Sequence, residues 1–101
     1  MSDARIAQVK AMIRAALLPF QLELGEARLF FFGSRVTGEA RERSDFDVAV
    51  EGQGRIQPSL ITRIRDALDE LPTLYRVDFV DLACVSEAAR SEMLKHVEAI
   101  L

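Results

Sequence analysis

The sequence of 101 residues predicts a small α/β (α+β) domain in which helices pack on a short sheet. Apolar residues recur every three or four positions in three segments, which is the spacing of amphipathic helices. Between these segments lie short runs that are wholly apolar or alternate between apolar and polar residues, as strands do. The predicted order is helix, strand, strand, helix, strand, helix. Because no repeat, linker or low-complexity stretch interrupts the chain, we expect residues 1–101 to form one domain.

Each predicted helix has a recognisable beginning. The first covers residues 3–18, with Ser2 as its N-cap. Pro58 suits the first turn of the second helix, where its missing N–H costs nothing, and Ser86 caps the third. The predicted core-facing residues are Ile6, Val9, Ile13 and Leu17 in the first helix, Ile61, Ile64, Leu68 and Leu71 in the second, and Ala89, Met93 and Val97 in the third, with Ile100 at a neighbouring position of that third helix.

The predicted strands differ in the faces that they bury. Residues 29–32 are wholly apolar, which indicates a strand covered on both faces. In residues 45–50 every second residue is a large apolar one, which indicates one core face. Residues 75–82 form the third predicted strand, with Asp78 between apolar neighbours. The polar residues 35–44 predict a loop or a short helix.

Composition excludes several classes of protein. Thirteen Lys and Arg against sixteen Asp and Glu give a net charge of -3. This balance argues against a dedicated nucleic-acid binder, without excluding nucleic acid as a substrate. No apolar run approaches the ~18 residues of a membrane span, so we expect no membrane association. The single cysteine, Cys84, forbids an intramolecular disulfide and suits a cytoplasmic protein.

Two aspartates begin the second predicted strand. Asp45 and Asp47 are two positions apart, so their carboxylates lie on the same face, about 7 Å apart along the chain. Like charges held side by side repel each other, and a divalent cation removes the repulsion. Carboxylate oxygens suit Mg²⁺ or Mn²⁺, and Mg²⁺ often adds substrate phosphates to one or two carboxylates. An exposed strand face with two solvated acids is the alternative interpretation of this motif taken alone.

A glycine-serine pair ends the first predicted strand. Gly33 allows a tight turn and a close approach of a ligand to the backbone. Backbone N–H groups there, with the Ser34 hydroxyl, suit a phosphate group, and Arg35 adds a donor able to face an anion. Taken alone, these residues also fit an ordinary turn between a strand and a loop.

Asp78 is the third candidate acid. A carboxylate among apolar neighbours is costly unless it has a partner or faces water. It would serve as a third metal ligand or as the base for an attacking hydroxyl. Asp81 is the rival candidate, but the two differ in strand parity and therefore face opposite sides of a regular strand.

Taken together, these motifs resemble a known family. Residues 32–38 (FGSRVTG), then 44–47 (SDFD), then 76–82 (RVDFVDL), resemble the signature of the DNA polymerase beta-like nucleotidyltransferases, and most closely the minimal nucleotidyltransferases of bacteria and archaea. The resemblance covers nearly the whole chain. It implies a palm-like short mixed sheet with helices packed on one face.

The resemblance also implies a reaction. Metal ions (Mg²⁺ or Mn²⁺) would lie between Asp45, Asp47 and Asp78, and Gly33 and Ser34 would hold the outer phosphates of a nucleoside triphosphate. The nucleoside monophosphate, AMP if the substrate is ATP, would pass to a hydroxyl acceptor with release of pyrophosphate.

Partners are also implied by the resemblance. Small members of the family pair with a helical protein, either a substrate-binding subunit or a toxin of the HEPN class. A second copy of the chain, in a homo-oligomer, is another way to complete the acceptor site. The alternative function is a non-catalytic, antitoxin-like subunit that neutralises its partner by contact. The full set of acids favours the enzyme.

Overall fold

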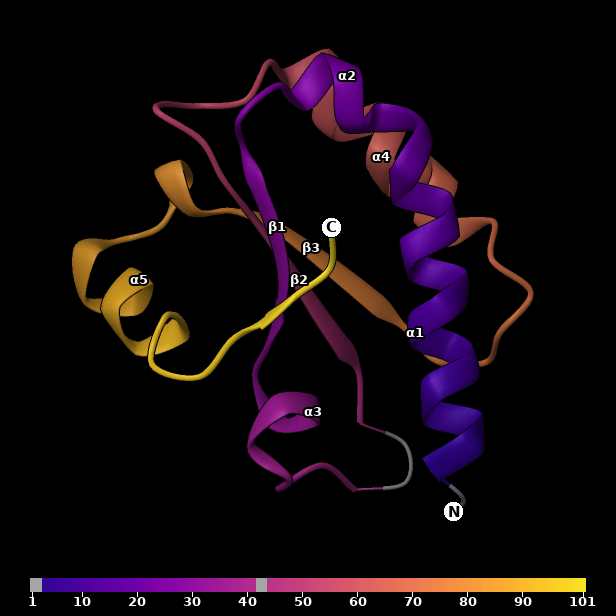
Figure 1. Ribbon diagram of the computed structural model, residues 1–101. Coiled ribbons are helices and arrows are strands. Elements are labelled where there is room, and N and C mark those ends of the chain that lie inside the picture. Colours follow the sequence, from indigo (N-terminus) through magenta and orange to yellow (C-terminus); the bar gives the residue numbers. More distant parts are fainter. Residues whose placement is uncertain (1–2, 42–43) are drawn as a thin grey trace.

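The computed structural model describes residues 3–41 and 44–101 and contains a four-stranded mixed sheet (Figure 1). The strand order is β3-β2-β1-β4, in which β1 is antiparallel to β2 and to β4, whereas β2 and β3 are parallel. The elements are α1 (Asp3–Leu17), η1 (Leu18–Phe20), α2 (Gln21–Leu24), β1 (Arg28–Phe32), α3 (Ser34–Thr37), β2 (Phe46–Glu51), α4 (Pro58–Asp69), β3 (Val77–Asp81), η2 (Leu82–Cys84), α5 (Glu87–Met93) and β4 (Glu98–Ala99). This mixed sheet with helices confirms the predicted fold class.

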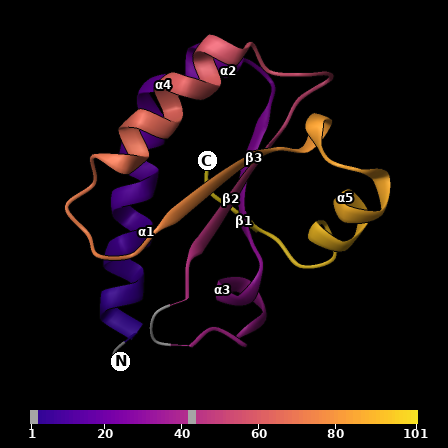
Figure 2. The same ribbon diagram turned by 180° about the vertical axis from the view of Figure 1, so that it is seen from behind.

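The main core lies between the sheet and the two long helices, α1 and α4, which cover the same side (Figures 1 and 2). Its fully buried members include Ile13 and Leu17 of α1, Ile64 of α4 and Phe31 of β1. A smaller cluster on the opposite side contains Phe30, Phe32, Ala49 and Leu82, with Met93 packed against it. The phenylalanine strand is therefore covered on both faces, as predicted. The resemblance implies helices packed on one face of the sheet. This is true of α1 and α4, whereas α5 lies on the other side (Figures 1 and 2).

The predicted third helix is too long. It begins as expected at Ser86, whose hydroxyl accepts a hydrogen bond from Ala89 N at 3.1 Å, but it ends at Met93. Residues 98–99 form β4 beside β1, and Ile100 is buried in the main core. An exposed edge of β1 would carry unpaired backbone groups, and β4 satisfies part of that edge. Val97 therefore belongs to the connection into β4 and not to a helix face.

The other boundaries differ less. Pro58 opens α4, as predicted. The third strand begins at Val77 and ends at Asp81, shorter than residues 75–82. The polar segment after Gly33 contains the short helix α3. The predicted N-cap, Ser2, lies outside the described residues. Among the described helices, none combines the length and apolar character needed to cross a bilayer.

Candidate active site

The parallel pairing of β2 with β3 places Asp47 directly opposite Asp78. Phe46 and Val48 are fully buried in the main core, so Asp47 between them faces the other side of the sheet. Neighbouring strands lie about 4.8 Å apart, which brings the two carboxylates into the same small region. Asp45 stands just before β2, outside the strand ladder. The structure thus brings two of the three predicted acids into register, with the third beside them.

These acids interact electrostatically. The pKa of the Asp47 carboxyl is raised, chiefly because burial disfavours its charged form, and further because the carboxylates of Asp78 and Asp45 repel it. A divalent cation would relieve this repulsion, so the donor set fits one. In the described part of the chain, however, no three His, Cys, Asp or Glu side chains form a ready-made metal-binding group. A cation at this place would need further oxygens, from a bound phosphate or from water.

Asp47→Asn is expected to stabilise the metal-free protein at neutral pH. Below the pKa of an unfolded aspartate, about 3.9, the carboxyl is protonated in both states and carries no penalty. As the pH rises through the raised pKa of the folded state, ionised Asp47 destabilises the fold. Asparagine cannot ionise, so it removes this destabilisation. Melting temperatures at pH 3 and pH 7 measure the effect, with the exposed Asp66→Asn on α4 as the matched control. A gain no larger at pH 7 than at pH 3 would contradict this electrostatic picture.

Gly33 connects the end of β1 to α3 and lies against Asp47. Its backbone has φ +77° and ψ −156°, a region that essentially only glycine occupies. A Cβ at this position would collide with Asp47 Oδ2 and lie 3.3 Å from its Cγ. The Gly33 carbonyl accepts hydrogen bonds from Val36 N and Thr37 N at 3.0 and 3.2 Å, which begin α3. Ser34 is the first residue of that helix, so the predicted phosphate turn lies beside the carboxylates.

Gly33→Ala is therefore expected to cost about 1–3 kcal/mol in the free energy of unfolding and to displace the Asp47 carboxylate. Gly38→Ala is the matched control, because Gly38 also has positive φ (+85°) but a Cβ there would meet no atom within 4 Å. Urea denaturation and binding of Mg²⁺ with an ATP analogue measure the two effects. Both variants should lose stability, and only Gly33→Ala should lose analogue binding. Equal binding by the two variants would show that the contact with Asp47 is unimportant.

Arg35 contacts other parts of the protein in the structure. Its guanidinium Nη2 donates a hydrogen bond to the Ser44 carbonyl at 2.6 Å, and Cζ lies 4.6 Å from the centre of the Phe46 ring. The motif predicts a donor that faces a bound anion. In the structure the guanidinium is engaged with the protein itself, because the buried aromatic ring and the carbonyl offer it a stacking surface and an acceptor.

The third strand separates the two rival acids. Asp78 accepts a hydrogen bond from Arg76 Nε at 3.0 Å on the exposed side of the sheet. Asp81 is buried, and its two oxygens accept from Ile56 N at 2.8 Å and Ala83 N at 3.0 Å. Asp81 therefore joins the β2–α4 connection to the end of β3 and is directed away from Asp47, as its parity predicts.

An open hollow of about 560 Å³ borders the acids. It follows the outer edge of β3, and its charged lining residues are Asp47, Asp69, Asp78, Arg65 and Arg76. The sequence alone assigns no role to either arginine. The signal for Arg76 is its position two residues before Asp78 in the quoted motif, whereas Arg65 comes from α4 and has no such signal. The hollow can accept an anionic or hydroxyl-bearing group next to the carboxylates.

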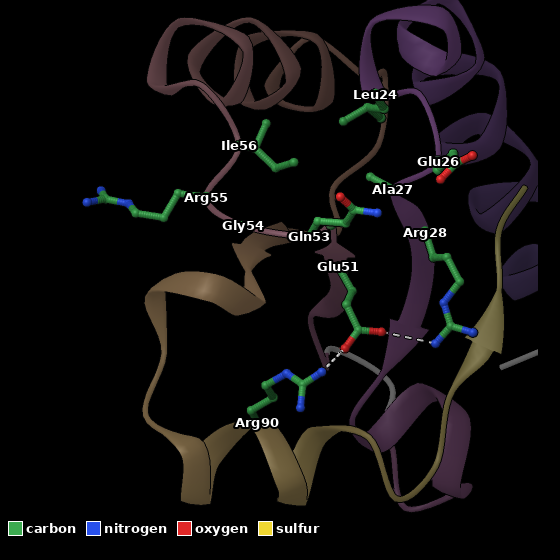
Figure 3. Close-up of a pocket in the computed structure, with 11 residues that line it drawn as sticks. Leu24, Glu26, Ala27, Arg28, Glu51, Gln53, Gly54, Arg55, Ile56 and Arg90 are labelled. Carbon is green, nitrogen blue, oxygen red and sulfur yellow. Dashed lines mark hydrogen bonds and ion pairs between the residues drawn. The ribbon is translucent and has the colours of Figure 1, made fainter.

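A second hollow, of about 720 Å³, lies at the opposite end of the sheet (Figure 3). Figure 3 shows Glu51 between Arg28 and Arg90, both of which donate to its carboxylate, Arg28 at 3.1 Å. Across the sheet Glu51 is paired with Arg28 and not with a second carboxylate, and Glu26, which also lines this hollow, precedes β1. We therefore assign the candidate active site to the Asp47 end.

Known proteins match both the sequence and the fold. A family model described as polymerase beta, nucleotidyltransferase, matches residues 27–101. The probable protein adenylyltransferase MntA of Haemophilus influenzae is 34% identical over 70 residues, which are 69% of this chain and 60% of that protein. This chain thus matches somewhat less than two thirds of the length of that relative.

Two solved structures share the fold. A toxin-antitoxin complex with AMP-PNP contains a chain that superposes with a TM-score of 0.62 at 22% identity, over 91% of this chain and 72% of that one. A complex of a tri-AMPylated Shewanella oneidensis HEPN toxin with its MNT antitoxin gives a TM-score of 0.56 at 17% identity, over 91% and 71% of the two chains. The match of the family model to most of the chain confirms the resemblance drawn from the motifs: the chain belongs to the polymerase beta nucleotidyltransferase family.

Proposed function

We propose that this protein is a metal-dependent nucleotidyltransferase that transfers AMP from ATP to a hydroxyl group of a partner protein. The observation that carries the proposal is the juxtaposition of Asp47 with Asp78, beside the Gly33 turn. Two opposed carboxylates with mutually unfavourable charge suit a cation and a triphosphate better than they suit a structural role. Family membership supports the reaction class.

The reaction balances without a further reactant. The acceptor hydroxyl oxygen attacks the α-phosphorus, the bond from that phosphorus to the bridging oxygen breaks, and pyrophosphate leaves. Asp45, Asp47 and Asp78 would hold the divalent cation, which supplies charge neutralisation at the phosphates. Asp78 borders the hollow along β3, through which an acceptor would approach, and this supports Asp78 as the group that would take the hydroxyl proton. Gly33 and Ser34 would contact the outer phosphates.

The choice of ATP and of a protein acceptor is supported by the relatives. MntA is named a probable protein adenylyltransferase, and one related structure contains AMP-PNP. The other contains a HEPN toxin that carries AMP groups. The hollow in this chain is open. This agrees with an acceptor that is itself a folded protein and covers the site when it binds. Use of ATP and the lack of a disulfide fit a cytoplasmic location.

The test is transfer of label from ATP labelled in its α-phosphate. The purified chain is incubated with labelled ATP and Mg²⁺, with and without the product of an adjacent gene, which this proposal expects to be a small helical protein. We expect label on that protein, lost with Asp47→Asn and retained with Asp66→Asn. Neutralisation of the partner without any transfer of label would instead establish the non-catalytic, antitoxin-like function.

A further inference from the structure

We infer that Arg35 is a positioning residue that fixes the phosphate turn against the carboxylate pair. The inference rests on the proposed function. In this role Arg35 acts through its stack with Phe46 and Tyr75 and not through contact with the nucleotide. Tyr75, which lies outside the sequence motifs, supports the site by the same stack. We call these three residues the aromatic clamp.

The contacts of the clamp are close and mutual. Arg35 Cζ lies 4.6 Å from the centre of the Phe46 ring and 5.2 Å from that of Tyr75. The two rings meet edge to face, with their centres 5.4 Å apart and their planes at 86°. Phe46 is fully buried, so it forms a fixed surface for the other two. The guanidinium also donates to the Ser44 carbonyl at 2.6 Å.

Each member of the clamp comes from a different segment of the candidate site. Arg35 follows the Gly33–Ser34 turn, Phe46 stands between the two aspartates of the β2 motif, and Tyr75 precedes β3 by two residues. These segments are far apart in the sequence, yet they meet at one guanidinium group. Movement of any of them relative to the others would disturb the stack.

Asp45 depends most on the clamp. Regular pairing of β2 begins at Phe46, so the sheet does not hold Ser44 or Asp45. The hydrogen bond from Arg35 to the Ser44 carbonyl fixes the backbone immediately before Asp45. Ordering this segment in advance lowers the entropy cost of assembling the site when metal and nucleotide bind.

Arginine is suited to this position in a way that lysine is not. The planar guanidinium stacks on rings while its N–H groups bond in the ring plane, whereas an ammonium is a compact point charge with neither property. Arg35→Lys therefore keeps the charge but loses the clamp. If Arg35 instead bound the nucleotide by charge, lysine would preserve most of that binding.

The experiment is a double-mutant cycle in the chain of 101 residues. Arg35→Gln, Tyr75→Leu and the double variant are compared for the dissociation constant of Mg²⁺ with an ATP analogue that cannot be cleaved at the α-phosphate, measured by calorimetry. We expect each single variant to weaken binding about 10-fold, because a misplaced site loses its preorganisation. The double variant should be no weaker than the worse single variant. Arg35→Lys should resemble Arg35→Gln.

Arg63→Gln is the matched control. Arg63 also stacks on a ring, 5.5 Å from the centre of Phe20, and pairs with Glu23 at 2.8 Å, away from the candidate site. It should lose stability comparably but keep analogue affinity, which separates positioning from general loss of folding. Two results would overturn the inference: an unchanged dissociation constant in Tyr75→Leu, or rescue of analogue binding by Arg35→Lys. If no variant, wild type included, binds the analogue, the proposed function fails before the clamp is tested.

Discussion

Replacing Asp45 and Asp47 together by asparagine is expected to lower the rate of the proposed AMP transfer by about 1,000-fold or more, because the variant would lose two of the charges proposed to hold the cation. Asparagine keeps the size of each side chain. Burial raises the pKa of Asp47, so its charge is unfavourable in the metal-free fold. The variant should therefore remain folded. Its rate is measured as label transferred per minute from α-labelled ATP.

The same variant separates binding from chemistry. Mg²⁺ with an ATP analogue should raise the melting temperature of the wild type through linkage, since only the folded state binds them. Most of that rise should disappear in the double variant and persist in Asp66→Asn. If the double variant gains as much as the wild type, the metal and nucleotide bind elsewhere.

Asp78→Asn and Asp81→Asn are expected to fail in different ways. Asp78→Asn should lower the transfer rate about 100-fold to 10,000-fold and leave stability nearly unchanged, because it would remove the proposed cation ligand or base at a half-exposed position. Asp81→Asn should cost about 1–3 kcal/mol in the free energy of unfolding, since the amide NH₂ replaces an oxygen that accepts a backbone N–H. Its rate per folded molecule should be unchanged.

Urea denaturation and label transfer on the same preparations measure this contrast. The reverse ranking, with Asp81→Asn inactive but stable, would mean that β3 is registered differently against β2. The parallel pairing of Asp47 with Asp78 would then be wrong.

Much of the fold follows from local patterns. Helical spacing predicts α1 and α4 because each has one apolar face that must be covered, and the buried Ile13 and Ile64 lie on those faces. The same parity rule places Asp47 and Asp78 away from the main core. What periodicity does not contain is register: the direct opposition of the two aspartates depends on how β2 and β3 align, which is a property of the packed sheet.

Long-range contacts account for the differences from the predictions. Residues 94–100 continue a helical pattern, but burial of Ile100 beside β1 and the pairing of Glu98 with Lys10 and Arg14 favour a strand. The contacts of Arg35 likewise come from other segments of the chain. The Ser44 carbonyl and the Phe46 ring belong to one segment and Tyr75 to another, and periodicity does not predict that these segments meet at Arg35.

Paramagnetic broadening by Mn²⁺ tests the location of the active site most directly. Substoichiometric Mn²⁺ is titrated into the ¹⁵N-labelled chain with the uncleavable ATP analogue, and the loss of each amide signal is followed. We predict that signals of Ser34, Asp47 and Asp78 broaden first, and that those of Glu51 and Arg90, at the other end of the sheet, broaden last. Broadening that begins at Glu51 and Arg90, or that is uniform over the chain, would contradict a nucleotidyltransferase site built on Asp47 and Asp78.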